Sequence, residues 1–324
     1  MFKENVPIVE LTSYKIGGPA RYFFEARNPG ELSDAVREAR SKNLKIFILG
    51  GGTNLLMPDE GFNGLILKSG FDGIEISGNE VRTGAGISMT ELLDFFILHG
   101  LSGFEWAGGL PGTVGGAIRG NAGAFGGEMK DAITSARSFD IETLQEIERE
   151  ASACDFGYRS SVFKKREGKE IILSATFALK KGDAEALRKS IYEKINYRKE
   201  RHPLEYPNIG SIFKNVPVSQ MNADVAQMNA DTIRVHPRNN PRQSAFTAPV
   251  KNDPFPVVPA AYLISEAGLK GVSFGGAMIS SKHPNFIVNV LQAKASDVKT
   301  LIQLVKNEVE GKFGIILEEE IIRV

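Results

Sequence analysis

The apolar positions of the chain follow two periods, so both helices and strands are expected. Apolar residues recur with helical spacing over residues 31–42, 88–100, 183–202, 260–268 and 296–312. Short apolar runs between Gly, Asn and Asp predict strands over residues 20–26, 45–49, 64–68, 73–77, 80–83, 135–141, 146–151, 170–179, 276–280, 285–290 and 315–322. Mixed helices and strands in this order indicate an α+β chain, with an antiparallel layer between residues 135 and 179.

The helix over residues 88–100 has the clearest boundaries. Ser88 and Glu91 have the spacing of a capping box, and Gly100 is a typical C-terminal stop. Between them the apolar residues share one face, which we expect to be buried: Met89, Leu92, Leu93, Phe96 and Ile97.

Glycine is the unusual residue of this chain. It occurs 34 times in 324 residues, and ten of the 34 lie between residues 103 and 127, too many for a regular element. The predicted strand 45–49 also runs directly into Gly50–Asn54. Successive free N–H groups in such loops form a cradle for phosphate, and two loops would hold a diphosphate. The alternative is that the glycines only make tight turns between packed strands.

Composition narrows the function classes. Lys and Arg together number 39, as do Asp and Glu, so we expect neither a nucleic-acid nor a membrane partner. One cysteine and four scattered histidines predict neither a disulfide nor a metal site. No leader is evident and no apolar stretch approaches the ~18 residues of a membrane span, which predicts a cytoplasmic protein. The length predicts two or three packed units.

Three further groups of residues are candidates for chemistry. Arg159 lies between apolar neighbours, Ser211 follows a glycine, and carboxylates stand at residues 318–320, where a strand would send Glu318 and Glu320 to one face. For each there is an ordinary alternative: an exposed strand arginine, a turn serine and solvated charges.

Ten blocks in order resemble the UDP-N-acetylenolpyruvoylglucosamine reductase (MurB) family, over about 90% of the chain. They are Ser13–Gly18, Leu49–Leu56, Gly84–Gly86, Gly109–Ala117, Asn121–Gly126, Tyr158–Lys164, Gly210–Asn215, Ala267–Gly271, His283–Asn289 and Leu317–Glu320. The resemblance implies a two-lobed FAD-binding region of the vanillyl-alcohol-oxidase (PCMH) type, then an α/β substrate domain. We expect lobes at residues 1–68 and 69–182 and the substrate domain at 183–324, whose last strand 315–322 returns to the FAD region.

The same resemblance implies a peptidoglycan-precursor enzyme that uses FAD and NADPH and acts on a UDP-sugar, UDP-N-acetylglucosamine enolpyruvate. Its expected cofactor-binding residues are Gly50, Gly51, Gly52, Thr53, Asn54, Leu55, Gly112, Thr113, Gly115, Gly116, Asn121 and Gly123. Its expected substrate-binding residues are Tyr158, Arg201, Lys214 and Asn215. No metal is implied, and we expect a monomer.

The family's three catalytic positions fall on Arg159, Ser211 and Glu320. The resemblance implies that Arg159 holds the carboxylate and enolate oxygens, that Glu320 polarises the same group, and that Ser211 protonates the α carbon. A serine hydroxyl is a weak acid, so it needs a neighbour that stabilises its alkoxide, either Lys214 or a relayed water.

One segment departs from the family's pattern, and the remaining length indicates a type within the family. Residues 217–253 are longer than the link usual in the family and resemble a surface insertion, while the remaining length matches the shorter type of the family, which lacks an additional substrate-binding loop. An FAD-dependent oxidase of the same fold and a catalytically inactive nucleotide-binding flavoprotein are the alternatives. No histidine or cysteine that could tether FAD occurs between Met1 and Leu98, and the inactive form would not need Arg159, Ser211 and Glu320 together.

Overall fold

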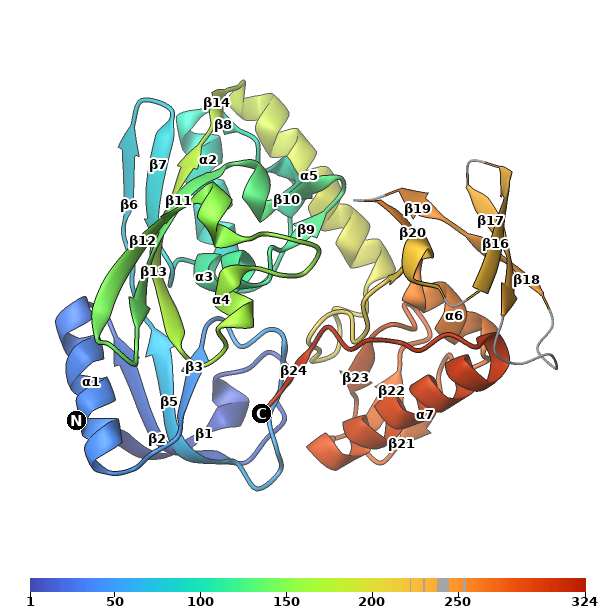
Figure 1. Ribbon diagram of the computed structural model, residues 1–324, viewed down its shortest axis with the longest axis horizontal. Coiled ribbons are helices and arrows are strands. Elements are labelled where there is room, and N and C mark those ends of the chain that lie inside the picture. The colour runs from blue at the N-terminus through green and yellow to red at the C-terminus, as the bar shows by residue number, and fades with distance from the viewer. Residues whose placement is uncertain (222, 230, 238–244, 253–254) are drawn as a thin grey trace. The chain divides into compact units, whose positions relative to one another are not determined.

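The structure, a computed structural model, describes residues 1–221, 223–229, 231–237, 245–252 and 255–324. The chain divides into two compact units (Figure 1). Unit 1 comprises Met1–Pro7, Pro19–Gly52 and Gly61–Glu200, and unit 2 comprises Ile8–Gly18, Thr53–Glu60 and Arg201–Val324. These two units interleave along the chain. The finer division into two FAD-binding lobes and a substrate domain stays a prediction.

The first sheet of unit 1 has four strands in the order β1 (Lys3–Pro7), β2 (Pro19–Ala26), β5 (Phe62–Ser69) and β3 (Ile46–Leu49). Only the β1–β2 pair is antiparallel. Helix α1 (Pro29–Ser41) begins where the Asn28 side chain accepts a hydrogen bond from the Glu31 N–H group. Its buried face, which includes Leu32 and Val36, shares a core with Leu65 and Leu67 of β5.

The second sheet of unit 1 is antiparallel, which confirms the layer predicted between residues 135 and 179. Its order is β12 (Gln145–Glu150), β11 (Ile133–Asp140), β13 (Glu170–Ala178), β7 (Glu80–Gly84) and β6 (Ile74–Ser77). Its helices are α2 (Met89–His99), α3 (Val114–Arg119), α4 (Val162–Lys165) and α5 (Ala184–Arg201). Unit 1 also contains two short strand pairs, β8 (Leu101–Ser102) with β14 (Lys180–Lys181) and β9 (Gly123–Ala124) with β10 (Gly127–Glu128).

Helix α2 confirms the boundaries predicted for it. The Ser88 side chain accepts a hydrogen bond from the Glu91 N–H group, and Gly100 ends the helix in the left-handed conformation. The five apolar residues expected on its inner face are all buried.

Unit 2 is built from short strands around α6 (Ala260–Glu266) and α7 (Ala295–Phe313). The strands are β4 (Leu55–Leu56) with β24 (Ile322–Arg323); β15 (Val216–Pro217), β20 (Pro256–Val258) and β19 (Lys251–Asn252); β16 (Ala223–Asn229), β17 (Thr232–Pro237) and β18 (Phe246–Pro249); and β21 (Ser273–Phe274), β22 (Ala277–Ile279) and β23 (Ile287–Asn289).

Polar contacts bind the two early segments into unit 2. The buried Tyr14 hydroxyl donates to the Ile287 carbonyl oxygen at 3.0 Å, and the Asn289 amide donates to the Tyr14 carbonyl oxygen at 3.2 Å. The Asp59 carboxylate accepts from the Ala295 and Ser296 N–H groups, where α7 begins. An acidic group is favoured at that helix end because the free N–H groups leave it partly positive.

Two expectations for unit 2 were wrong. The segment 217–253 contains strands β16–β18, whose Ile233, Val235 and Ala248 are buried in the unit's core, so it is not simply a surface insertion. Residues 222, 230, 238–244 and 253 of that segment lie outside the described residues. The strand expected over residues 315–322 is also mostly absent: only Ile322–Arg323 is a strand, with an isolated bridge between Phe213 and Glu319.

Candidate functional site

The two predicted glycine loops of unit 1 touch each other. A Cβ atom at Gly51 would lie 2.6 Å from the Gly112 Cα atom and 3.1 Å from the Thr113 nitrogen. Gly112 itself has a positive φ of 102°, which favours glycine. Close backbone packing therefore explains Gly51 by itself, as the tight-turn interpretation of these glycines expected.

Part of the second loop is helical, contrary to the expectation that its glycines exclude a regular element. Thr113 caps α3, and its side chain accepts from the Gly116 N–H group at 3.5 Å. The N–H groups of Val114 and Gly115 donate to the carbonyl oxygens of Ile87 and Ala85, both at 2.9 Å. Gly115 lacks a side chain because a Cβ atom there would lie 2.9 Å from the Ala85 Cβ atom. These N–H groups are therefore not free for a ligand.

Several N–H groups of the two loops remain available in unit 1. Within the described part of the chain, those of Gly50, Gly51, Gly52, Gly112 and Thr113 donate no hydrogen bond. Gly116 is also open on one side, since a Cβ atom there would meet only the Thr113 hydroxyl, at 3.6 Å. Unpaired donors around bare backbone fit the diphosphate of FAD.

The remaining residues of the first loop belong to unit 2. Leu55 is buried in β4 and pairs with Ile322 of β24, so its side chain packs in the protein. The Asn54 side-chain amide donates to the Glu320 carbonyl oxygen at 3.1 Å, and the Ile322 N–H group donates to the Asn54 carbonyl oxygen at 3.0 Å. Thr53 is half-buried.

Asn121 has a structural role in unit 1. Its buried amide nitrogen donates to the Glu128 carboxylate at 3.1 Å and to the Gly157 carbonyl oxygen at 3.0 Å, so both of its donors are used. Its amide oxygen accepts from the Lys130 N–H group. Gly123 is close-packed instead, since a Cβ atom there would lie 2.7 Å from the Glu128 Cγ atom.

Arg159 lies at the tip of a tight turn in unit 1. Its φ is 52°, a strained value for a residue with a side chain, and the Lys164 ammonium donates to its carbonyl oxygen at 2.9 Å. The guanidinium lies 5.3 Å from the centre of the Tyr158 ring and donates to the Gly123 carbonyl oxygen at 3.0 Å. The turn thus aims a partly buried cation at the β9–β10 hairpin.

Ser211 and Glu320 lie on neighbouring segments of unit 2. The Glu320 N–H group donates to the Ile212 carbonyl oxygen at 2.8 Å, and the Lys214 N–H group donates to the Glu318 carbonyl oxygen at 2.9 Å. Among the described residues, the Ser211 hydroxyl has no hydrogen-bond partner. Arg159 and Tyr158 belong to unit 1, whereas Ser211, Glu320 and Arg201 belong to unit 2.

The other polar side chains on these two segments form ion pairs or hydrogen bonds within unit 2. Lys214 forms an ion pair with the exposed Glu318 rather than a contact with Ser211. Glu319 is paired with Lys306 and Arg323. The Asn215 side-chain oxygen accepts from the Ala260 N–H group at 3.1 Å, at the start of α6. Lys214 is therefore not held as the activating neighbour of Ser211.

Sequence reasoning missed two groups. Arg198 of α5 is mostly buried beside the β9–β10 hairpin, and the only signal was a basic cluster at the end of the predicted helix. His202 and His283, far apart in the chain, have ring centroids 5.3 Å apart in unit 2. Burial lowers the pKa of His283 to about 4, and Lys251 acts in the same direction.

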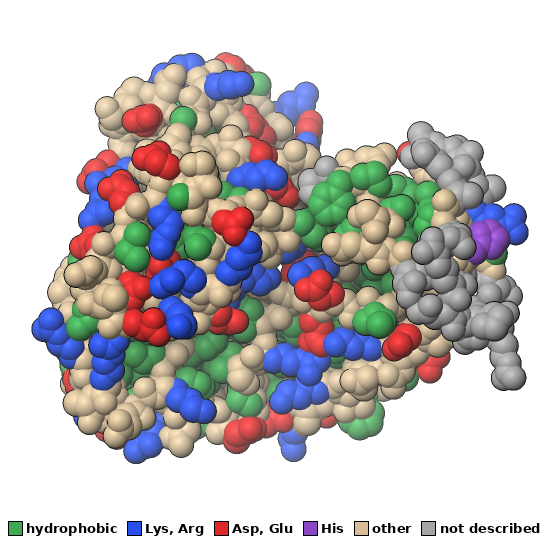
Figure 2. All heavy atoms as spheres, viewed as in Figure 1, with side chains coloured by type: hydrophobic (Ala, Val, Ile, Leu, Met, Phe, Trp, Pro, Cys, Tyr) green, Lys and Arg blue, Asp and Glu red, His purple; other side chains and the backbone are tan. Residues whose placement is uncertain are grey.

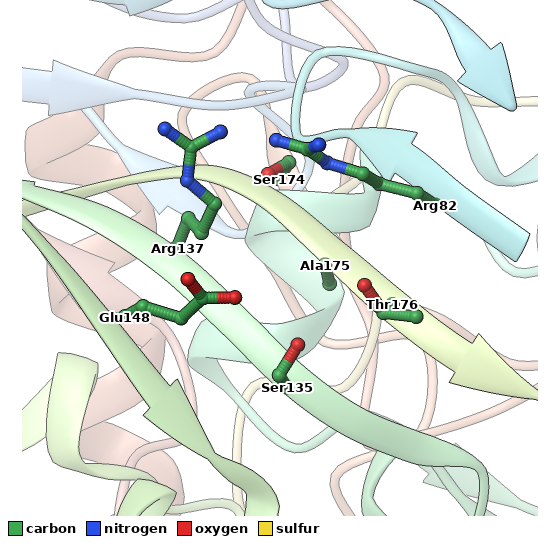
Figure 3. A pocket seen from close by; sticks show the side chains of 7 residues that line it. All are labelled: Arg82, Ser135, Arg137, Glu148, Ser174, Ala175 and Thr176. Carbon is green, nitrogen blue, oxygen red and sulfur yellow. The ribbon is translucent and has the colours of Figure 1, made fainter.

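A cavity of about 260 Å³ opens on the polar face of the five-stranded sheet, away from these residues. Figure 3 shows Ser174 between the side chains of Arg82 and Arg137. Its lining contains none of the predicted site residues; it consists of Arg82, Ser135, Arg137, Glu148, Ser174, Ala175 and Thr176. This cavity is therefore not the candidate active site.

Several features of the described residues bear on other kinds of site. Burial raises the pKa of the Cys154 thiol to about 11, so it stays protonated near neutral pH. In the described ranges, no cluster of three or more His, Cys, Asp or Glu side chains could hold a metal, and no helix has the length and hydropathy to cross a membrane. Figure 2 shows cationic and anionic side chains interspersed on the visible face of unit 1.

Comparison with known proteins places this geometry in a family. Residues 20–142 match the model of an FAD binding domain, and residues 202–324 match that of the C-terminal domain of UDP-N-acetylenolpyruvoylglucosamine reductase. The second match includes the segment 217–253.

Relatives of that name align over nearly the whole chain. The protein from Carboxydothermus hydrogenoformans is 37% identical, over 98% of this chain and 93% of its own length, and that from Caldicellulosiruptor bescii is 36% identical, over 99% and 90%. The crystal structure of the Thermus caldophilus enzyme (MurB) is 28% identical, with a TM-score of 0.73 over 100% of this chain and 99% of that one. With its FAD-binding domain and α+β fold, this chain belongs to the UDP-N-acetylenolpyruvoylglucosamine reductase family.

Proposed function

We propose that this protein reduces UDP-N-acetylglucosamine enolpyruvate to UDP-N-acetylmuramate with NADPH, in peptidoglycan precursor synthesis, as a cytoplasmic monomer without a nucleic-acid partner. The similarity to named reductases over 98% of the chain carries the proposal. When bound, FAD accepts a hydride from NADPH and supplies one to the enolpyruvyl double bond.

The free donors of unit 1 would hold the cofactor's diphosphate. Gly51, Gly52, Gly112 and Thr113 offer unpaired N–H groups, and Gly116 offers open backbone. Such donors need no reorganisation when an anion arrives, because the packing of Gly51 on Gly112 already fixes them. Among the predicted cofactor residues, Leu55 and Asn121 would then support the site through packing and hydrogen bonds rather than through side-chain contact with the ligand.

Arg159, Ser211 and Glu320 are the proposed catalytic residues. Reduction at the β carbon leaves negative charge on the α carbon and its carboxylate. The Arg159 guanidinium would hold that carboxylate, Glu320 would polarise it, and the Ser211 hydroxyl would give its proton to the α carbon. The 2.8 Å bond between the Glu320 N–H group and the Ile212 carbonyl oxygen supports a joint role for Ser211 and Glu320. Tyr158, Arg201, Lys214 and Asn215 remain proposed substrate contacts.

A two-step absorbance experiment tests the function. The purified protein should be yellow, NADPH should bleach it without oxygen, and the enolpyruvyl sugar nucleotide should restore the colour. Recolouring by oxygen alone would favour an oxidase, and a colourless protein that FAD cannot reconstitute would contradict the proposal. Size-exclusion chromatography with light scattering tests the monomer.

A further inference from the structure

The guanidinium of Arg198 is mostly buried but only partly bonded. It extends from α5 in unit 1, and its Nε–H group donates to the Gly108 carbonyl oxygen at 2.9 Å. Its Nη2 atom is buried and has no hydrogen-bond partner among the described residues. A buried charged donor without a partner is costly, so a native protein that keeps one has a reason for it, such as strain, a catalytic role or an ion.

The groups around Arg198 do not neutralise its charge. Its guanidinium lies 5.3 Å from the centre of the Phe125 ring, and the Tyr197 ring meets the same phenylalanine edge-on at 5.2 Å. Within the described ranges, Arg198 forms no ion pair with a carboxylate. Burial lowers its pKa, and the positive charge of Arg159 lowers it further, so the two arginines destabilise each other's charged forms.

Both arginines lie against one small element of unit 1. Arg159 donates to the carbonyl oxygen of Gly123, at the base of the β9–β10 hairpin, and the Arg198 guanidinium lies over the ring of Phe125 at its tip. Phe125 has a φ of 51°, so the tip is strained as well. Two neighbouring cations beside a strained turn form an arrangement that an anion would stabilise.

We infer that Arg198 is a second binding residue for the substrate's carboxylate, which it shares with Arg159. This inference rests on the proposed function, in which Arg159 holds that carboxylate. The planar guanidinium has several N–H donors in fixed directions, so the donor left over from Gly108 can bind a carboxylate oxygen. Arg201, the arginine chosen from the sequence, lies three residues further along the same cluster.

The test compares Arg198→Gln with Lys194→Gln. Lys194 lies one turn earlier on α5, and its ammonium also lies near the Phe125 ring, 5.7 Å from its centre. Its side chain is partly exposed, and within the described ranges its one ion pair is with Glu193. We expect Arg198→Gln to raise the KM for the enolpyruvyl sugar nucleotide about 10- to 100-fold, the range for a lost charge-assisted hydrogen bond. In Arg198→Gln the rate of NADPH bleaching should stay within about twofold of wild type. Lys194→Gln should change neither this rate nor the KM. Arg198→Lys should have a KM between those of wild type and Arg198→Gln.

The outcomes separate the inference from the proposed function. A flavin-loaded wild-type protein that never recolours with the sugar nucleotide would overturn both. If the wild type turns over, an unchanged KM in Arg198→Gln overturns the inference alone. Equal slowing of NADPH bleaching would also overturn it, because the guanidinium would then serve the cofactor or the fold. Thermal unfolding of each variant checks that it is folded, and direct titration with the sugar nucleotide measures binding without turnover.

Discussion

The side-chain amide of Asn54 donates a hydrogen bond to the backbone carbonyl oxygen of Glu320 at 3.1 Å. Asn54 is the last residue of the first glycine loop, and Glu320 carries the candidate polarising carboxylate. One hydrogen bond therefore joins a predicted cofactor residue to a predicted catalytic segment within unit 2.

We expect Asn54→Leu to loosen the Glu320 segment. Losing the hydrogen bond should slow recolouring by the sugar nucleotide more than tenfold and lower the free energy of unfolding by about 1 kcal/mol. NADPH bleaching should change much less. Stopped-flow absorbance measures both steps. If the variant instead binds FAD weakly and is otherwise normal, the amide serves the cofactor directly.

Two glycines near the loop contact should respond differently to alanine. A Cβ atom at Gly51 would strike the backbone at Gly112, so Gly51→Ala should destabilise unit 1 by several kcal/mol or prevent FAD loading. Gly116→Ala has room within the protein and should improve the helix propensity of α3 by up to about 1 kcal/mol.

The Gly116→Ala protein tests where the cofactor lies. If the diphosphate approaches that open backbone, the variant should be at least as stable as wild type but bind FAD at least tenfold more weakly. Chemical unfolding and FAD titration of the apoprotein measure the two effects. Gly311→Ala, in open space on α7, is the control and should leave FAD binding unchanged.

Ser211→Ala should separate the two halves of the reaction. The hydroxyl has no partner among the described residues, so its removal should leave NADPH bleaching intact. Recolouring should slow by several orders of magnitude, because the proposed function assigns protonation of the α carbon to this hydroxyl. The control is Ser273→Ala, because the exposed Ser273 hydroxyl bonds, among the described residues, only the Gly271 carbonyl oxygen. Equal slowing of both steps in Ser211→Ala would refute the acid role.

His283 should make unit 2 sensitive to acid. Its pKa is about 4 in the folded protein against 6.5 unfolded, so folding favours the neutral ring. The resulting stabilisation is present above pH 6.5 and is lost as the pH falls toward 4, by on the order of 3 kcal/mol. Urea unfolding should therefore show a steeper loss between these pH values in wild type than in His283→Gln. Parallel curves would show that His283 does not titrate there.

The sequence predicted best what depends on local period and caps. Helix α2 was predicted to the residue because Ser88, Gly100 and the apolar face agree. The strand expected over residues 315–322 was wrong for a tertiary reason. Leu317 and Ile321 are apolar because they are buried, but the segment that carries them pairs with other strands at few positions. Helix α3 was missed because its glycines suggested irregular structure. Gly115 is a glycine because Ala85 packs against it in the folded protein, which the local sequence does not reveal.

The polar residues of the candidate site were proposed from the resemblance, and their individual contacts were not predictable. Nothing local in the sequence distinguishes Asn121, whose amide is consumed inside the protein, from Asn54. Arg198 was not predicted, because its burial and its unpaired nitrogen result from contacts with Gly108 and Phe125 that form only in the folded protein. Such properties arise from contacts between distant segments.

The pairing of β4 with β24 constrains how the protein is made. Leu55 leaves the ribosome long before Ile322 is translated, so β4 must wait for its neighbour during synthesis. Unit 1 can close its two sheets before then, because residue 200 completes it. A ribosome stalled at about residue 300 should therefore carry a protease-resistant unit 1 beside an open, cleavable segment around residues 53–60.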